Sequence, residues 1–139
     1  MIPNTDNALR MLSQRMMVQL LPDLKSNYSI SDGFMIGLLV NAIADEMAEG
    51  IHRRVEDIED MRRVLKSAPD GLPAGSAALL DAPLEDLRLA TVNERHDALT
   101  RLLIQIQTRA EETDDVALQA EIWGYLRRHA ARHVITAVP

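Results

Sequence analysis

Cysteine is absent from the 139-residue chain, and aromatic side chains make up only 3% of it. Without cysteine the protein has no thiolate nucleophile, no iron–sulfur cluster and no cysteine-ligated zinc site. A cysteine-free sequence also fits a reducing compartment, so we expect a cytoplasmic protein. The excess of arginine over lysine is typical of a bacterial genome, so we expect a bacterial protein.

Segments typical of membrane and nucleic-acid proteins are also missing. No run of about 20 apolar residues is long enough to cross a bilayer, and residues 1–10 (MIPNTDNALR) lack the basic and apolar regions of a secretory signal. The net charge of −6 disfavours contact with a phosphate backbone. We therefore expect no membrane partner and no nucleic-acid partner.

Helix-forming residues dominate what is present. Apolar side chains recur at steps of three and four, and no segment alternates with period two between turn signals. This pattern predicts four helices, at about residues 5–21, 31–66, 83–111 and 114–133. The fold class that follows is all-α: one domain, residues 1–139, forming an up-down-up-down four-helix bundle with a very long second helix.

The apolar stripes of these helices predict the core. Trp123 is the largest side chain on any stripe, and we expect it to bridge several helices. The residues predicted to be buried together are Leu12, Met16, Ile43, Met47, Leu99, Leu103 and Trp123.

Local signals also predict the helix ends and one solvated face. We expect Asp81 and Thr113 to cap the third and fourth helices, a single helical turn at 77–80, and a weak point of the second helix at Gly50. The second helix carries alternating arginines and carboxylates, which we interpret as a solvated face laced with ion pairs. These residues are Arg53, Arg54, Glu56, Asp57, Glu59, Asp60, Arg62 and Arg63.

The four histidines are the most informative side chains. If the short connection near residues 112–113 makes the last two helices antiparallel, and the end of the second helix at Lys66 pairs with the start of the third at Pro83, all four fall within about two turns of one level. Imidazoles and carboxylates that project inward from different helices bind iron or manganese in helical bundles. The candidate metal ligands are Glu49, His52, His96, His129 and His133.

A structural role for these histidines is the interpretation that we favour. Carboxylate-bridged metal sites need several carboxylates in step with the histidines, and only Glu49, three residues before His52, fits that spacing. The third helix has Asn93 where such a site needs a carboxylate. We therefore predict no bound metal and no cofactor.

Two short stretches resemble a known family. Residues 20–24 (LLPDL) are similar to a Leu-Pro-x-Leu turn that ends a helix, and residues 40–44 (VNAIA) to an Asn-Ala core motif in the next helix. Both are features of an uncharacterised family of small bacterial all-helical proteins, associated with acyl-CoA dehydrogenase-like and aminoglycoside phosphotransferase-like neighbours. The resemblance implies a helical bundle and assigns no functional residue.

Two functions follow from these features. The second predicted helix is much longer than the first and the fourth, so its apolar stripe needs a cover, and a second copy of the chain is the simplest one. We therefore expect a non-enzymatic homodimer, or another complex, that acts by protein–protein interaction. The alternative is a bundle that binds a metal or a small ligand at the histidines, which leaves a ferritin-like enzyme open. No motif with catalytic mechanics is present, so the balance is against an enzyme.

Overall fold

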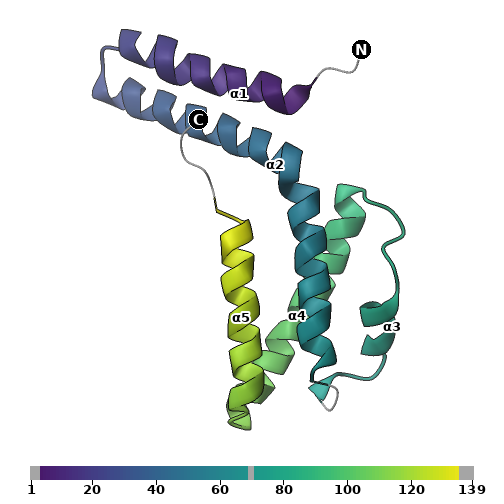
Figure 1. Cartoon of the computed structure of the whole chain (residues 1–139). Helices are drawn as coiled ribbons and strands as arrows, with labels where there is room; N and C mark the ends of the chain where they lie inside the picture. Colours follow the sequence, from purple (N-terminus) through teal and green to yellow (C-terminus); the bar gives the residue numbers. More distant parts are fainter. Residues whose placement is uncertain (1–3, 69–70, 135–139) are drawn as a thin grey trace. The chain divides into compact units, whose positions relative to one another are not determined.

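The computed structural model describes residues 4–68 and 71–134, and all regular structure within them is helical (Figure 1). The all-α class and the long second helix are therefore confirmed. The elements in chain order are α1 (Thr5–Arg15), a π-helical turn (Met16–Leu20), a 3₁₀ turn (Leu21–Asp23), α2 (Asn27–Lys66), α3 (Ser76–Asp81), α4 (Leu89–Glu112) and α5 (Val116–Arg132). None of the helices in these ranges is apolar enough over a sufficient length to cross a membrane.

The helices pack in two compact units whose boundary follows Gly50. The first unit contains α1 and the N-terminal part of α2, and the second contains the remainder of α2 with α3, α4 and α5. Gly50 does not interrupt α2, which is helical from Asn27 to Lys66.

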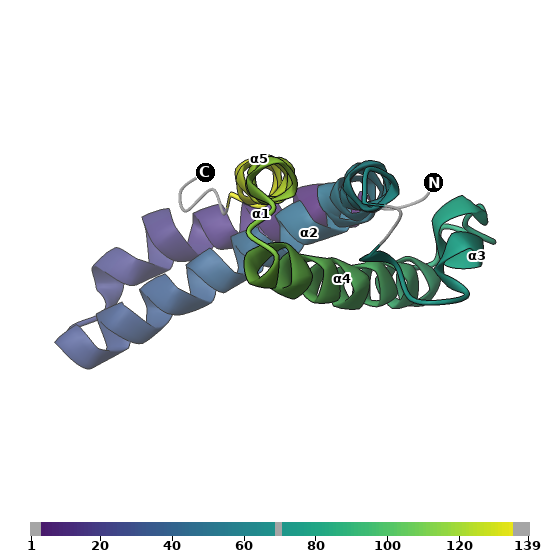
Figure 2. The ribbon, with the colours of Figure 1, turned by 90° about the horizontal axis from the view of Figure 1, so that it is seen from below.

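The first unit is a helical hairpin, with α1 running antiparallel to the start of α2 (Figures 1 and 2). Asn4 precedes α1, and Asp6 lies in its first turn, where a negative charge suits the helix dipole. α2 begins four residues before the predicted start because Ser26 accepts a hydrogen bond from the amide of Ser29, at 3.0 Å, as an N-cap does.

Small residues make the contact between the two helices of the hairpin. The Ser13 hydroxyl donates to the carbonyl of Gly37 at 2.8 Å, and both residues are buried. A Cβ atom at Gly37 would lie only 2.7 Å from the sulfur of Met17. Asn41 and Ala44, one and two turns further along α2, are also buried. The helices therefore approach closely at glycine, serine and alanine, and the half-buried side chain of Met17 packs over Gly37.

The second unit has the main hydrophobic core. The C-terminal half of α2 and α5 are seen nearly end on in Figure 2, with α4 crossing beneath both. The core is built from these three helices, with Leu80 of α3 covering one end. Its most buried large members are Ile58, Met61, Leu65, Val92, Leu99, Ile106 and Ile122.

The short helix of the long loop is confirmed, but both predicted caps are wrong. Asp81 ends α3 and pairs with Lys66 at 2.7 Å, and α4 begins only at Leu89. α5 is capped by Asp115, whose carboxylate accepts from the amide of Leu118 at 3.1 Å. The Thr113 hydroxyl instead donates to the carbonyl of Arg109 in the last turn of α4. It therefore pairs with α4 and does not cap α5.

The predicted core is correct only in part. Leu99 and Leu103 are buried, whereas Trp123 is 57% exposed. Ile122 and Tyr125 occupy the inner face of α5, and Trp123 lies about 100° around the helix from Ile122. In the first unit Met16 is half-buried, while Leu12, Ile43 and Met47 are exposed, because small residues fill the space between α1 and α2.

Candidate functional sites

Three of the four histidines meet in the second unit. His96 comes from α4, His129 from the last turn of α5, and His133 is the C-cap of that helix. The ring centroids of His96 and His129 are 6.3 Å apart, and those of His129 and His133 are 4.4 Å apart. The prediction that these three lie at one level is confirmed, because the short turn between α4 and α5 fixes the register of the two helices.

The other two predicted ligands are not in this cluster. The His52 side chain is 68% exposed, and its nearest acidic partner is Glu56 at 3.7 Å, one turn along α2. Glu49 is exposed and belongs to the first unit. His52 is therefore not brought together with the other three histidines, because its side chain lies on another face of α2. Five residues separate it from Asp57, which is about 140° around the helix.

Asp57 of α2 is the centre of the histidine cluster, and its side chain is 0% exposed. Its Oδ2 atom accepts from His129 Nδ1 at 2.9 Å and from His133 Nε2 at 2.6 Å. His96 Nε2 lies 3.7 Å from the same oxygen. That nitrogen is buried and has no hydrogen-bond partner in the described part of the chain.

The surroundings of Asp57 keep it ionised. Burial alone raises the pKa of a carboxyl group, but the nearby side chains of His96, His133, His129 and Arg132 outweigh burial and hold the pKa of Asp57 well below its ordinary value. Burial raises the pKa of Tyr125, and the charge of Asp57 raises it further. The ring centroid of Tyr125 is 5.8 Å from that of His129.

A second buried carboxylate, Asp60, lies one turn further along α2. Arg128 of α5 donates to both of its oxygens at 2.8 Å, and Arg63 donates at 2.9 Å. The hydrogen bonds from Arg128 are the main reason that the pKa of Asp60 is lowered. Arg132 donates to both Asp57 and Asp60 and so connects the two carboxylates.

The prediction of a solvated face is therefore wrong for Asp57 and Asp60, which are among the most buried side chains of the protein. The signal that sequence reasoning missed is a simple one. Asp57 precedes Met61 by one helical turn and Asp60 precedes Val64 by one, so both lie on the stripe that enters the core. Their charges are neutralised by α5, far away in the sequence.

The first unit carries a different candidate site, an exposed apolar surface. Of the 19 large apolar side chains that are exposed in the described residues, 12 belong to the hairpin, although it is the smaller unit. Of the 14 buried apolar residues, only Ala44 does. Five of the exposed ones follow one face of α2, and we call them the outer stripe: Met35, Ile36, Leu39, Ile43 and Met47.

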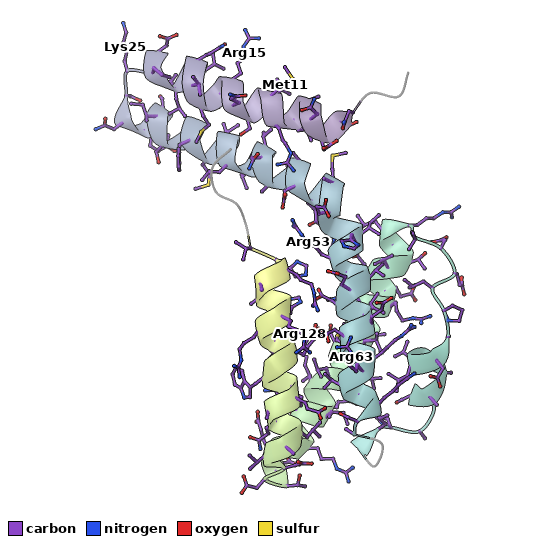
Figure 3. All side chains as sticks on the ribbon, in the orientation of Figure 1. Met11, Arg15, Lys25, Arg53, Arg63 and Arg128 are labelled. Atoms are coloured by element: carbon purple, nitrogen blue, oxygen red, sulfur yellow. The ribbon has the colours of Figure 1, made fainter. Side chains whose placement is uncertain are left out.

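A further exposed apolar surface lies on α1. Met11 projects from the side of α1 that faces away from α2 (Figure 3), and it is exposed together with Leu12 and Val18. The hairpin therefore has apolar side chains on its outer faces and small residues at its centre, the reverse of the usual arrangement of a folded domain.

Comparison of the chain with family models, with curated proteins and with solved structures finds no match. A functional assignment therefore depends on these two sites.

Proposed function

We propose that the chain is a non-enzymatic self-association module, in which the outer stripe of α2 packs against the same stripe of a second copy. The observation that carries this proposal is the inverted hairpin: its apolar side chains are outside, and its helix contact is built from small residues. The resemblance to small all-helical proteins is compatible with such a role. The cysteine-free, acidic sequence supports a cytoplasmic location.

The exposed apolar area is close to what a stable dimer requires. Burying a Leu-sized side chain is worth 1.5–3 kcal/mol at about 25 cal/mol per Å², so such a side chain has roughly 60–120 Å² of apolar surface. Twelve side chains that are about half exposed therefore leave roughly 600 Å² of apolar area on the whole hairpin, of which the five side chains of the outer stripe carry roughly 250 Å². A standard interface takes about 800 Å² from each partner, and somewhat more than half of it is apolar.

A second hairpin is the partner that best fits this surface. Two helices do not enclose a core, whereas two hairpins that share one apolar face form a four-helix bundle. A twofold axis brings each residue of the stripe against the stripe of the other copy, so that one apolar face covers another without a separate partner. Homodimer interfaces are also the most apolar class of interface.

Light scattering of the purified chain tests the proposal. We expect a mass of at least twice the 15.5 kDa chain at micromolar concentration. Leu39→Glu combined with Ile43→Glu places four charges in the shared interface, so this variant should have the mass of one chain. Far-UV circular dichroism of the variant shows whether it keeps its helices.

The matched control is Ile104→Glu with Val116→Glu in the second unit. Ile104 is 58% exposed and Leu39 is 56% exposed, so both variants replace equally accessible apolar side chains. The control should keep the mass of the unmodified protein. A monomeric unmodified protein, or a stripe variant that remains a dimer, would contradict the proposal.

A further inference from the structure

We propose that Asp57, His129 and His133 bind one divalent transition-metal ion of the zinc type, and that His96 becomes the fourth ligand when its side chain moves toward the ion. The inference concerns the second unit alone and does not depend on self-association of the first.

The ligand atoms are already gathered. One oxygen of Asp57 and one ring nitrogen each of His129 and His133 all lie within 4.8 Å of one another. Zinc binds imidazole nitrogen and carboxylate oxygen at about 2.0–2.2 Å, which places neighbouring ligands of a tetrahedral ion roughly 3.3 Å apart. The two hydrogen bonds to Asp57 Oδ2, at 2.9 and 2.6 Å, show that the side chains approach within that range.

His96 supplies the observation that a purely structural cluster does not explain. A buried polar atom without a hydrogen bond destabilises the folded state, and His96 Nε2 is such an atom in the described residues. It points to Asp57 Oδ2 from 3.7 Å, a distance too long for a hydrogen bond but suited to an ion seated between them. His96 lies outside the group of ligand atoms that are within 4.8 Å of one another, so its side chain must move toward the ion. That movement would give its nitrogen a partner and complete a four-ligand shell from three helices.

The residue next to the site holds the aspartate in the required orientation. Arg132 donates to Oδ1 of Asp57, whereas the three histidines face Oδ2. Oδ1 is therefore occupied by the protein, and Oδ2 is turned toward the imidazoles. Hydrogen bonds of this kind to the second oxygen of a ligating carboxylate fix its orientation in metal sites.

The donor set selects the class of metal. In the sequence, only Glu49 has the spacing to a histidine that a carboxylate-bridged site needs. Asp57 provides the anionic ligand that the predicted site lacks. Three imidazoles and one carboxylate suit zinc and its neighbours in the first transition row, and they suit magnesium and calcium poorly because those ions prefer oxygen. The histidine side chains are 20–35% exposed, so an ion can reach them from solvent.

Ion binding requires a rearrangement of protons. In the ion-free cluster the nitrogens of His129 and His133 that face Asp57 donate to it and so carry hydrogen. On binding, each nitrogen must present its lone pair to the ion. The proton either moves to the other ring nitrogen, if the imidazole is neutral, or leaves to solvent if the ring is charged.

Calorimetric titration of the full chain tests the site. The protein is purified without a histidine tag, treated with a chelator, dialysed and titrated with zinc chloride or magnesium chloride. We expect one zinc ion per chain and no binding of magnesium. His129→Gln combined with His133→Gln should weaken zinc binding by at least about 100-fold, since loss of a supporting residue alone costs 10- to 100-fold.

His52→Gln is the matched control, because His52 also has a carboxylate neighbour but lies outside the cluster. It should leave both stoichiometry and affinity unchanged. No zinc binding by the unmodified chain, equal binding by the double variant, or loss of binding in His52→Gln would each overturn the proposal.

A measurement on the unmodified chain avoids any doubt about the folding of the variant. Nitrogen-15 spectra of the histidine side chains should show three imidazoles shifting together on addition of one equivalent of zinc, with His52 unaffected. A shift of His52 alone, or no shift, would overturn the proposal. Self-association is read from mass and metal binding from stoichiometry, so the two proposals fail separately.

Discussion

Removing the carboxylate of Asp57 should destabilise the second unit strongly. Asp57→Ala leaves the imidazoles of His129 and His133 without their common acceptor and removes one of the two buried carboxylates that neutralise Arg132. Taking one partner from a buried ion pair costs 3–5 kcal/mol. Arg132 retains Asp60 and has Glu56 at 3.6 Å, so we expect a loss near the lower limit, about 3 kcal/mol.

Urea unfolding followed by circular dichroism at 222 nm measures this loss. Urea is preferred to guanidinium because it does not screen charges, and a chelator in the buffer removes any contribution from bound metal. Asp97→Ala is the matched control, because Asp97 also lies 3.7 Å from His96 but is exposed. It should cost less than about 1 kcal/mol, as surface ion pairs do. If Asp57→Ala also costs less than about 1 kcal/mol, the histidine cluster is not organised by this carboxylate.

Three further predictions concern single residues of the second unit. Trp123 should emit at the wavelength of a water-exposed indole, and Trp123→Ala should cost less than about 1 kcal/mol, whereas Ile122→Ala should cost about 2–5 kcal/mol in urea unfolding. The pKa of Asp60 is lowered in the folded state, so its contribution to stability is complete above the ordinary pKa of about 3.9 and is lost as the pH falls through the folded value. Urea unfolding between pH 6 and pH 3 should therefore show a loss of stability at the acid end that is smaller in Asp60→Asn, and an equal loss in both proteins would contradict this assignment. Asp115→Ala should cost about 1 kcal/mol as loss of an N-cap, and Thr113→Ala should cost less; the reverse order in urea unfolding would contradict the assigned cap.

The sequence predicted the secondary structure well because helices depend on local signals. Steps of three and four and the composition gave four helical ranges close to α1, α2, α4 and α5. The predicted cap of α5 was wrong because two nearby residues both suit the N-cap position. Thr113 and Asp115 both suit an N-cap, and Asp114 between them has a φ of 53°, which sets the turn so that only Asp115 reaches the first amides of α5.

The faces of the helices were harder to predict than their positions. A shift of one residue turns a side chain by about 100°, so the stripe drawn through Trp123 missed the true inner face through Ile122 and Tyr125. The predicted position of His52 was wrong for the same reason, because its side chain lies on another face of α2. The prediction was correct for His96, His129 and His133, because the connection between α4 and α5 is short enough to fix both the direction and the register of the two helices.

The candidate sites depend on contacts that the local sequence does not encode. Asp57 and Asp60 appear within a run of alternating charges that is typical of a solvated helix, and only the approach of α5 makes their burial possible. The sequence could not predict that the apolar side chains of the hairpin are exposed. An apolar stripe has the same periodicity whether a core or a second chain covers it.

Disulfide formation by Ile43→Cys is the most direct test of self-association through the outer stripe. The natural chain has no cysteine, so a single introduced thiol reports only on its own position. Position 43 lies near the middle of the outer stripe, and in the proposed dimer we place the twofold axis there, so that the two thiols face each other. We predict that mild oxidation links most of the chains into a covalent dimer that keeps its helical spectrum, whereas Ile104→Cys stays unlinked under the same conditions. Equal linkage of the two variants, or none in Ile43→Cys, would contradict the account.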